Sequence, residues 1–227
     1  MAIGKSKQAR ANILGRIRKA QGRGPGAGSE AQLEAVRTYL RAHPRGPLPD
    51  VSGDLVAHFR ARAESMQSTT EEVAVETEVP AAVARYLLAH KLPVAGCVWP
   101  ALSQLDWRGA GLALEARAPR RENDGDDLVG VTGAFAAIAE TGTLMVVSGP
   151  DTPASTSLLP ETHVAILHAG RIVPRMEEAW DLARQAYGQF PRAINFISGP
   201  SRTGDIEQQL VLGAHGPYRV HIVIVRG

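Results

Sequence analysis

The stretch RVHIVIV (residues 219–225) decides the fold class of this chain. Its last four residues, 222–225, are an unbroken aliphatic and β-branched run, which is typical of a strand covered on both faces. Strands buried on both sides belong mostly to parallel sheets flanked by helices. The stretch therefore indicates an α/β protein.

Further segments of strand length alternate with segments of helical period along the chain. The apolar bursts predict strands at 94–99, 111–116, 142–148, 163–168 and 193–198. Helical spacing of apolar residues predicts helices at 79–90, 128–139, 174–190 and 205–212. Strands that alternate with helices imply a three-layer, mostly parallel sheet. In such sheets ligands bind outside the carboxyl ends of the strands, where we expect the site.

The first third of the chain is helical and polar. Residues 1–24 hold seven Lys and Arg and no acid, although the whole chain has a formal charge of only +2. Such an arm can bind nucleic acid or an anionic membrane. Ile13, Leu14 and Ile17, however, form a narrow apolar stripe, so we favour a packed helix with a solvated basic face, and expect no nucleic-acid partner.

A Gly-rich stretch near 22–29 predicts a flexible linker after the basic arm. Helices are predicted at 30–42, after the N-cap candidate Ser29, and at about 54–66. We therefore expect a helical N-terminal extension at 1–68 and an α/β domain at 69–227.

The composition excludes several kinds of site. The chain has one cysteine, Cys97, in an apolar run, whereas an iron–sulfur cluster needs about four thiolates. No HExxH pair is present, and the acidic cluster 122–127 lacks the Gly and Glu positions of an EF-hand. We expect no metal and no cofactor. With no membrane span and no signal-peptide pattern, we expect a cytoplasmic protein.

The segment FISGPSRTGDIE (196–207) is predicted to run from a buried strand through small residues into a helix. Such a turn points backbone N–H groups at an anion, and an arginine beside it can clamp that anion. A tight connection in which Thr203 caps the helix explains the same residues equally well. The candidate ligand-binding residues here are Ser198, Gly199, Ser201, Arg202, Thr203 and Asp205.

The segment GVTGAFAAIAETGTL (130–144) predicts an apolar helix followed by a turn into the next strand. Burial at the end of that helix could raise the pKa of Glu140 and make it a catalytic acid, base or nucleophile. An exposed turn glutamate is the commoner case. The turn at 148–157 could close over the same pocket. The candidate ligand-binding residues are Gly130, Thr132, Thr141, Gly142, Thr143 and Ser155.

These segments resemble the lactate utilization protein C family, which carries a LUD domain. The matching stretches are GVTGAFAAIAETGTLMVVSGP (130–150), STSLLPETHVAIL (155–167) and FISGPSRTGDIEQQLVLGAHGPYRVHIVIV (196–225). The resemblance implies a fold similar to the sugar-phosphate isomerase and coenzyme A transferase group. It also implies a part in the oxidation of L-lactate to pyruvate beside separate iron–sulfur subunits. In related coenzyme A transferases a Glu closely followed by Gly is the nucleophile, and Glu140 with Gly142 is similar to that arrangement.

Three functions follow as hypotheses. We favour a non-redox component of a lactate-oxidising assembly that binds a small anionic ligand and iron–sulfur partners. The alternatives are a self-sufficient transferase or isomerase that uses Glu140, and a nucleic-acid or regulatory binder that works through the basic arm. The sequence leaves open the ligand, the oligomeric state and the role of residues 1–24.

Overall fold

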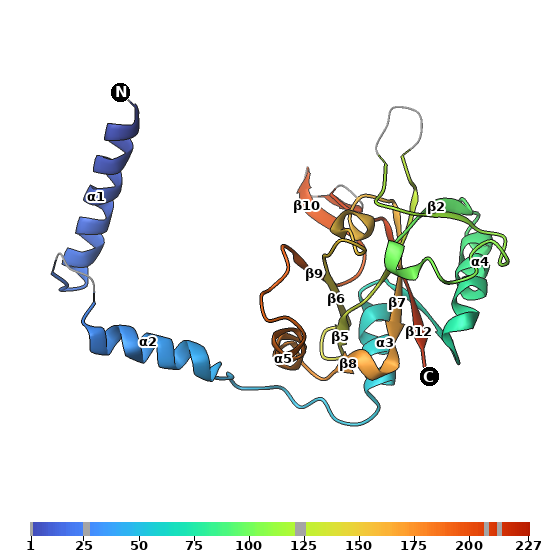
Figure 1. Ribbon diagram of the computed structural model, residues 1–227, viewed down its shortest axis with the longest axis horizontal. Helices are drawn as coiled ribbons and strands as arrows, with labels where there is room; N and C mark the ends of the chain where they lie inside the picture. The colour runs from blue at the N-terminus through green and yellow to red at the C-terminus, as the bar shows by residue number, and fades with distance from the viewer. Residues whose placement is uncertain (1, 25–27, 121–125, 207–208, 213–214) are drawn as a thin grey trace. The chain divides into compact units, whose positions relative to one another are not determined.

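The structure, a computed structural model, describes residues 2–24, 28–120, 126–206, 209–212 and 215–227 (Figure 1). The chain divides into two compact units, Met1–Pro47 and Leu48–Gly227. We expected the helix α3 (Leu55–Ser65) in the N-terminal extension 1–68. It belongs instead to the second unit.

The second unit is built on a six-stranded sheet in which every pairing is parallel. The strand from the 219–225 stretch lies inside this sheet between two partners, so both of its edges are paired. In spatial order the strands are β1 (Thr69–Val73), β12 (Arg219–Val225), β7 (Thr162–His168), β4 (Val129–Gly133), β2 (Ala95–Val98) and β3 (Ala113–Ala116). The predicted α/β class and parallel sheet are confirmed.

One face of the main sheet is covered by α4 (Val79–Ala89). Val83 and Leu87 of this helix are fully buried, and they share an apolar cluster with Val131, Val223 and other residues that alternate along the strands. The short 3-10 helices Glu76–Glu78 and Pro100–Leu102 lie just before α4 and after β2.

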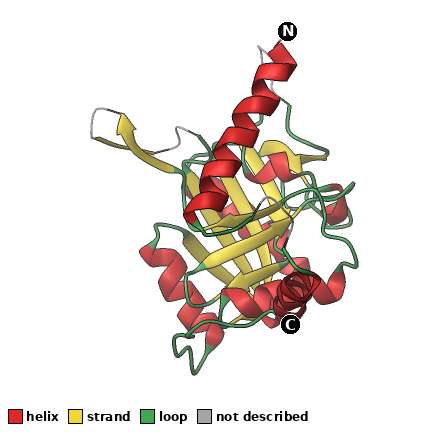
Figure 2. Ribbon diagram, turned by 90° about the vertical axis from the view of Figure 1, so that its left-hand side faces the viewer, coloured by secondary structure: helices red, strands yellow, loops and turns green. Residues whose placement is uncertain are grey.

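The other face is covered by α3 and by a second, mixed sheet that the sequence did not predict. Its strands, in spatial order, are β8 (Ile172–Val173), β5 (Ala136–Ile138), β6 (Thr143–Val147) and β9 (Ile194–Ile197). Beyond this sheet lies α5 (Met176–Ala186), whose Ala179 and Ala183 pack on Ile138 and Met145. The main part of the unit thus has two sheets between two outer helices (Figures 1 and 2).

Two predicted helices are wrong. Residues 128–139 form β4 and β5, because Gly130 and Gly133 are poor helix formers and Val129 and Val131 are β-branched. A Cβ at position 130 would lie 2.4 Å from the Thr156 carbonyl oxygen, in the 3-10 helix Ala154–Ser157. A fourth 3-10 helix, Ala169–Arg171, follows β7.

The second predicted helix, 205–212, is also wrong where the structure describes it. Residues 205–206 and 209–212 belong to β10 (Arg202–Ile206) and β11 (Gln209–Leu212), which pair antiparallel. Over these eight residues, the apolar positions 206, 210, 211 and 212 fit a helical period and a strand almost equally well, so the pattern could not distinguish a helix from a strand.

The first unit contains α1 (Ala2–Ala20) and α2 (Glu30–Ala42), so both predicted helices form. The apolar stripe of α1 is not packed as we expected, because Ile13 and Ile17 are exposed. Ser29 caps α2 as expected, in a capping box with Gln32. Residues 25–27 of the predicted linker lie outside the described residues, as do 121–125 of the acidic cluster. None of the helices in the described ranges is long and apolar enough to cross a membrane.

Candidate functional site

A pocket of about 480 Å³ lies along the outer face of α3 and brings together two of the turns singled out in the sequence. None of its residues directly follows a strand of the main sheet, so the carboxyl edge of that sheet does not build it. The lining residues are Pro49, Asp50, Val51, His58, Arg62, Ser65, Met66, Glu140, Thr141 and Ser198.

The helix α3 supplies one wall of this pocket, which we call the α3 pocket. It begins at Leu55 because the Asp54 carboxylate accepts hydrogen bonds from the backbone N–H groups of Val56 and Ala57, at 2.9 and 3.2 Å. Phe59 and Ala63 of the helix are fully buried in the core. The pocket residues His58, Arg62 and Ser65 follow a spacing of four and three residues, so they share the opposite, solvent-facing side.

The hairpin turn between β5 and β6 rests directly on the last turn of α3. Gly142 has a φ of 65°, and a Cβ there would lie 2.4 Å from the Ala63 backbone nitrogen. Only glycine allows this approach without strain. The close contact fixes Glu140 and Thr141 beside Arg62, and it places Glu140 in a hairpin turn and not, as predicted, at the end of a helix.

The turn after β9 makes a second close contact with the same end of α3. Gly199 has a φ of 80°, and a Cβ there would lie 2.2 Å from the Met66 carbonyl oxygen. The Arg202 side chain donates a hydrogen bond to that same oxygen at 2.7 Å. This bond satisfies a carbonyl group at the C-terminal end of α3. The Arg202 guanidinium, which we expected to bind an anion, therefore holds the turn after β9 against the helix.

A chain of three hydroxyl groups links the two turns. Thr143 Oγ1 lies 2.7 Å from Thr141 Oγ1 and 2.6 Å from Ser198 Oγ, both within hydrogen-bond distance. Thr143 is buried, whereas Thr141 and Ser198 are exposed on the pocket. Since a hydroxyl both donates and accepts, the two outer groups can present a donor or an acceptor to a ligand.

The α3 pocket holds charged side chains of both signs, Arg62 and Glu140 among them. Among the described residues, no side chain forms an ion pair or hydrogen bond with the Arg62 guanidinium or with the Glu140 carboxylate. Glu140 is half-buried and its backbone N–H donates to the Pro174 carbonyl oxygen at 3.0 Å. Within the ranges that the structure describes, no three His, Cys, Asp or Glu residues gather as a metal site.

Other predicted site residues lie elsewhere. Gly130 packs against Thr156, and Ser155 lies in the same 3-10 helix. Thr132 is fully buried and shares a 2.8 Å hydrogen bond with the His163 Nε2 atom. Burial lowers the pKa of His163 to about 4, so this ring is neutral at physiological pH. These residues do not line the α3 pocket.

The remaining candidates follow the β9 turn. Ser201 is half-buried, and its backbone N–H donates to the Pro217 carbonyl oxygen at 2.9 Å. Thr203 and Asp205 lie in β10, so the helix N-terminus that they were expected to form is absent. The helix-dipole part of the predicted anion site is therefore wrong.

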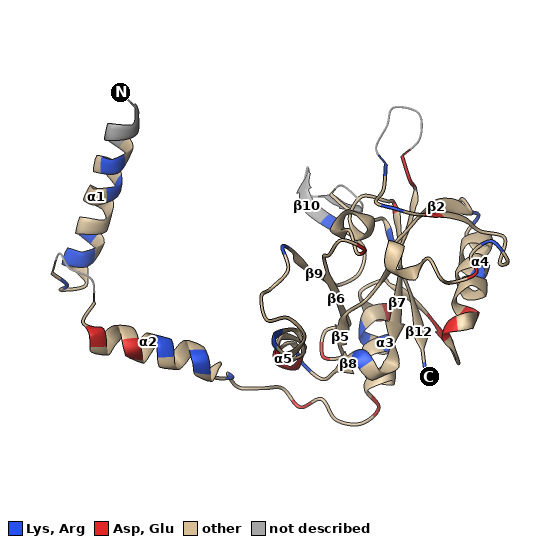
Figure 3. Cartoon of the chain, in the orientation of Figure 1, with Lys and Arg blue, Asp and Glu red and all other residues tan. Residues whose placement is uncertain are grey.

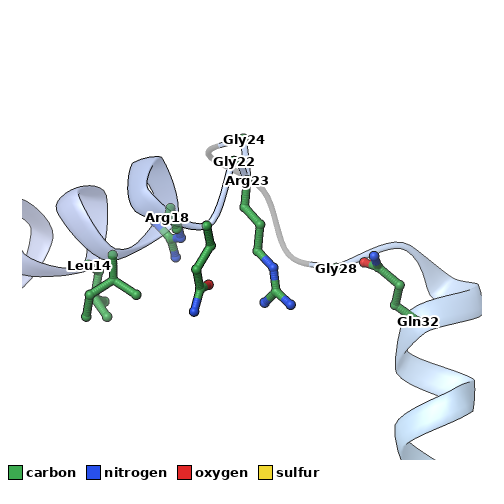
Figure 4. Close-up of a pocket in the computed structure, with 9 residues that line it drawn as sticks. Leu14, Arg18, Gly22, Arg23, Gly24, Gly28 and Gln32 are labelled. Atoms are coloured by element: carbon green, nitrogen blue, oxygen red, sulfur yellow. The ribbon is translucent and has the colours of Figure 1, made fainter.

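Other hollows are separate from the α3 pocket, and two of them concern segments discussed above. The turn predicted to close over the site at 148–157 instead lines a largely apolar pocket of about 630 Å³ with Pro191, Arg192 and Ala193. In the first unit, a hollow of about 620 Å³ lies between the end of α1 and the start of α2, where Arg18 and Arg23 are the charged residues (Figure 4). Neither contains a predicted site residue.

Sequence reasoning missed His58 and Arg62. The signal that could have found them is the polar spacing within the predicted helix 54–66, opposite the apolar Val56, Phe59 and Ala63. That spacing identifies a solvent-facing stripe, but only the tertiary fold brings Glu140 and Ser198 to it.

Comparison with known proteins gives the family. The family model of the LUD domain matches residues 61–225. The chain belongs to the LUD domain family. It is 43% identical over 100 residues to "Lactate utilization protein C" of Bacillus subtilis (strain 168), which is 43% of this chain and 42% of that protein. It is 35% identical over 130 residues to the protein of the same name from Bacillus licheniformis, which is 56% of this chain and 53% of that protein.

The chain thus spans about half the length of the curated relatives that it matches. A crystal structure of a DUF162 family protein from Deinococcus radiodurans shares the fold, with a TM-score of 0.59 at 22% identity. The similarity covers 78% of this chain and 99% of the Deinococcus radiodurans chain. The resemblance drawn from residues 130–225 is confirmed at the level of the family.

Proposed function

We propose that this LUD domain protein is a cytoplasmic component of L-lactate oxidation to pyruvate, that it acts beside separate iron–sulfur proteins, and that its α3 pocket binds the small carboxylate. The observation that supports this proposal most directly is the Arg62 guanidinium, which has no ion-pair or hydrogen-bond partner among the residues that the structure describes and shares the pocket with the exposed residues Thr141 and Ser198. The names of the relatives from Bacillus support the metabolic setting.

The residues of the pocket match the groups of a 2-hydroxy acid. A guanidinium can bind a carboxylate through two parallel hydrogen bonds. The Glu140 carboxylate can accept a hydrogen bond from the ligand hydroxyl. Ser198 or Thr141 can donate a hydrogen bond to the oxygen of that hydroxyl. A phosphate dianion would face the negative charges of Glu140 and Asp50, so a monocarboxylate fits this pocket better.

The redox step itself requires other proteins. The one thiol of the chain, Cys97, is buried in β2, and burial raises its pKa to about 12. An iron–sulfur cluster needs about four thiolates, so it cannot be held by this sequence. We therefore assign the electron carriers to partner proteins and the carboxylate to this chain.

Ligand binding is tested by titrating the purified chain with lactate, pyruvate and inorganic phosphate in a calorimeter. We expect the two carboxylates to bind and Arg62→Gln to weaken them about 10- to 100-fold, because a charged hydrogen bond contributes about 1.5–3 kcal/mol. Arg184→Gln, on the exposed side of α5, is the matched control and should leave affinity unchanged. Equal affinity of the Arg62 variant and the wild type would reject the assigned site.

The assembly is tested separately. A tagged full chain should copurify iron–sulfur proteins from cells grown on lactate, and the isolated chain should not oxidise lactate with a soluble electron acceptor. Lactate oxidation by the isolated chain would contradict the division of roles.

A transferase or isomerase is the second candidate, because the Glu140 carboxylate lies in the pocket with no hydrogen-bond or ion-pair partner among the described residues. In that case Glu140→Gln should abolish turnover of an acyl or sugar-phosphate substrate while binding persists. Under the lactate proposal the same variant changes only ligand affinity.

A further inference from the structure

The helix α2 is well formed but buries none of its residues. Its N-terminal end is stabilised locally by the Ser29 capping box, and the helix ends at His43 in the left-handed conformation. Its larger apolar side chains are exposed, from 39% at Leu33 to 66% at Tyr39. An isolated helix of 13 residues is marginal in water, so this helix gains stability if its apolar stripe is covered.

The apolar stripe of α2 has the spacing of a coiled-coil seam. Leu33, Val36 and Leu40 follow each other at three and four residues, which places them at the a, d and a positions of a heptad. Glu30 and Arg37 then both occupy e positions, on one flank of the seam, and Gln32 and Tyr39 occupy the g positions on the other.

The two e residues lie on the same flank of the helix in the structure. Arg37 Nη1 reaches back two turns and lies 2.9 Å from Glu30 Oε1. Figure 3 shows that the acidic residues lie in the first half of α2 and the basic residues in the second half. Both side chains are more than half exposed, so both are accessible to a partner.

We propose that α2 pairs with α2 of a second copy of this chain as an antiparallel coiled coil. In an antiparallel pair, e residues face e residues, and Glu30 of each copy lies opposite Arg37 of the other, which gives two ion pairs across the seam. Leu33 of each copy packs on Val36 of the other. A parallel pair would instead place Gln32 opposite Arg37, with no charge complementarity, so the charges specify the antiparallel orientation.

The proposed contact is small. A standard stable interface buries about 800 Å² on each partner, and three apolar side chains on a 13-residue helix provide less. The dimer should therefore be weak and depend on concentration.

Sedimentation equilibrium of the full chain tests the proposal. The weight-average mass should rise from 24.2 kDa toward about twice that value between about 5 and 500 μM. Val36→Asp should remove this rise. Ala31→Glu, at an exposed position on the opposite side of α2, is the control and should leave it unchanged.

A charge-swap pair keeps the test valid even if Val36→Asp unfolds the helix. Glu30→Arg places two arginines opposite each other, and Arg37→Glu places two glutamates opposite each other. Each variant alone should therefore dimerise at least about tenfold more weakly. An equimolar mixture should associate at least as well as the wild type, because each Arg then faces a Glu. The proposal would be overturned if the wild type stayed monomeric or if these substitutions left dimerisation unchanged. It would also be overturned if the mixture associated no more strongly than each variant alone.

Discussion

Replacing Gly142 by alanine should destabilise the second unit more than any simple loop substitution. An alanine at a φ of 65° costs roughly 1–2 kcal/mol because its Cβ crowds the neighbouring carbonyl group. The added Cβ would also lie 2.4 Å from Ala63 N and 2.6 Å from the Arg62 carbonyl carbon, and both atoms are backbone. The hairpin turn must then move off α3, which adds roughly 1–3 kcal/mol.

The total loss is roughly 2–5 kcal/mol, which lowers the melting temperature of a unit of this size by about 5–15 °C. Differential scanning calorimetry of the full chain measures the shift. Gly111→Ala is the matched control, because Gly111 has a φ of 78° but a Cβ there has no atom within 4 Å. Its loss should be limited to the backbone cost of roughly 1–2 kcal/mol. If both variants melt at the same temperature, the hairpin does not press on α3 as described, and the geometry of the α3 pocket is wrong.

Three other predictions address stability and reactivity. Burial, with a smaller effect of His90, lowers the pKa of His221 to about 4. In the unfolded chain the pKa of this histidine is near 6.5, so the unfolded state binds more protons between these two pH values. The free energy of unfolding should therefore fall as the pH drops from about 6.5 to about 4. Urea titrations at several pH values should show a shallower fall for His221→Phe, which keeps the ring stacked on Tyr86, and an unchanged one for the exposed His43→Gln. Cys97, buried with a pKa raised to about 12, should react with a thiol reagent only at the rate of unfolding, and fast labelling of the native chain would contradict its burial. Finally, a fragment of residues 61–227 should fail to fold while 48–227 folds, as circular dichroism would report, because Val56 and Phe59 belong to the core.

The sequence predicted the main sheet well where burial on both faces left a direct pattern. The runs at 163–168 and 219–225 became β7 and β12, which are neighbours inside the sheet. Prediction failed where short segments carried no periodicity of their own. The run AAI at 136–138 is a strand of three residues, and its partners in the second sheet, not its side chains, determine that it is extended.

The glycines of the site show a similar division between local and tertiary information. Gly142 and Gly199 were correctly singled out as turn residues, because small residues between apolar runs predict turns. Their role depends on α3, a helix more than 70 residues earlier in the sequence, whose backbone each of them touches. No local pattern reports such a contact.

The charged wall of the α3 pocket follows from the same tertiary constraint. Val56, Phe59 and Ala63 bury one side of α3 in the apolar cluster between the two sheets, and this fixes the opposite side, with His58 and Arg62, toward solvent. The hairpin and the β9 turn can touch the C-terminal end of α3 because the residues at the two contacts, Gly142 and Gly199, have no side chain. The core residues of α3 thus orient Arg62, and the glycines bring the hydroxyls and Glu140 to it. The family match begins at residue 61, inside α3, so part of the packing that orients Arg62 lies upstream of the matched segment.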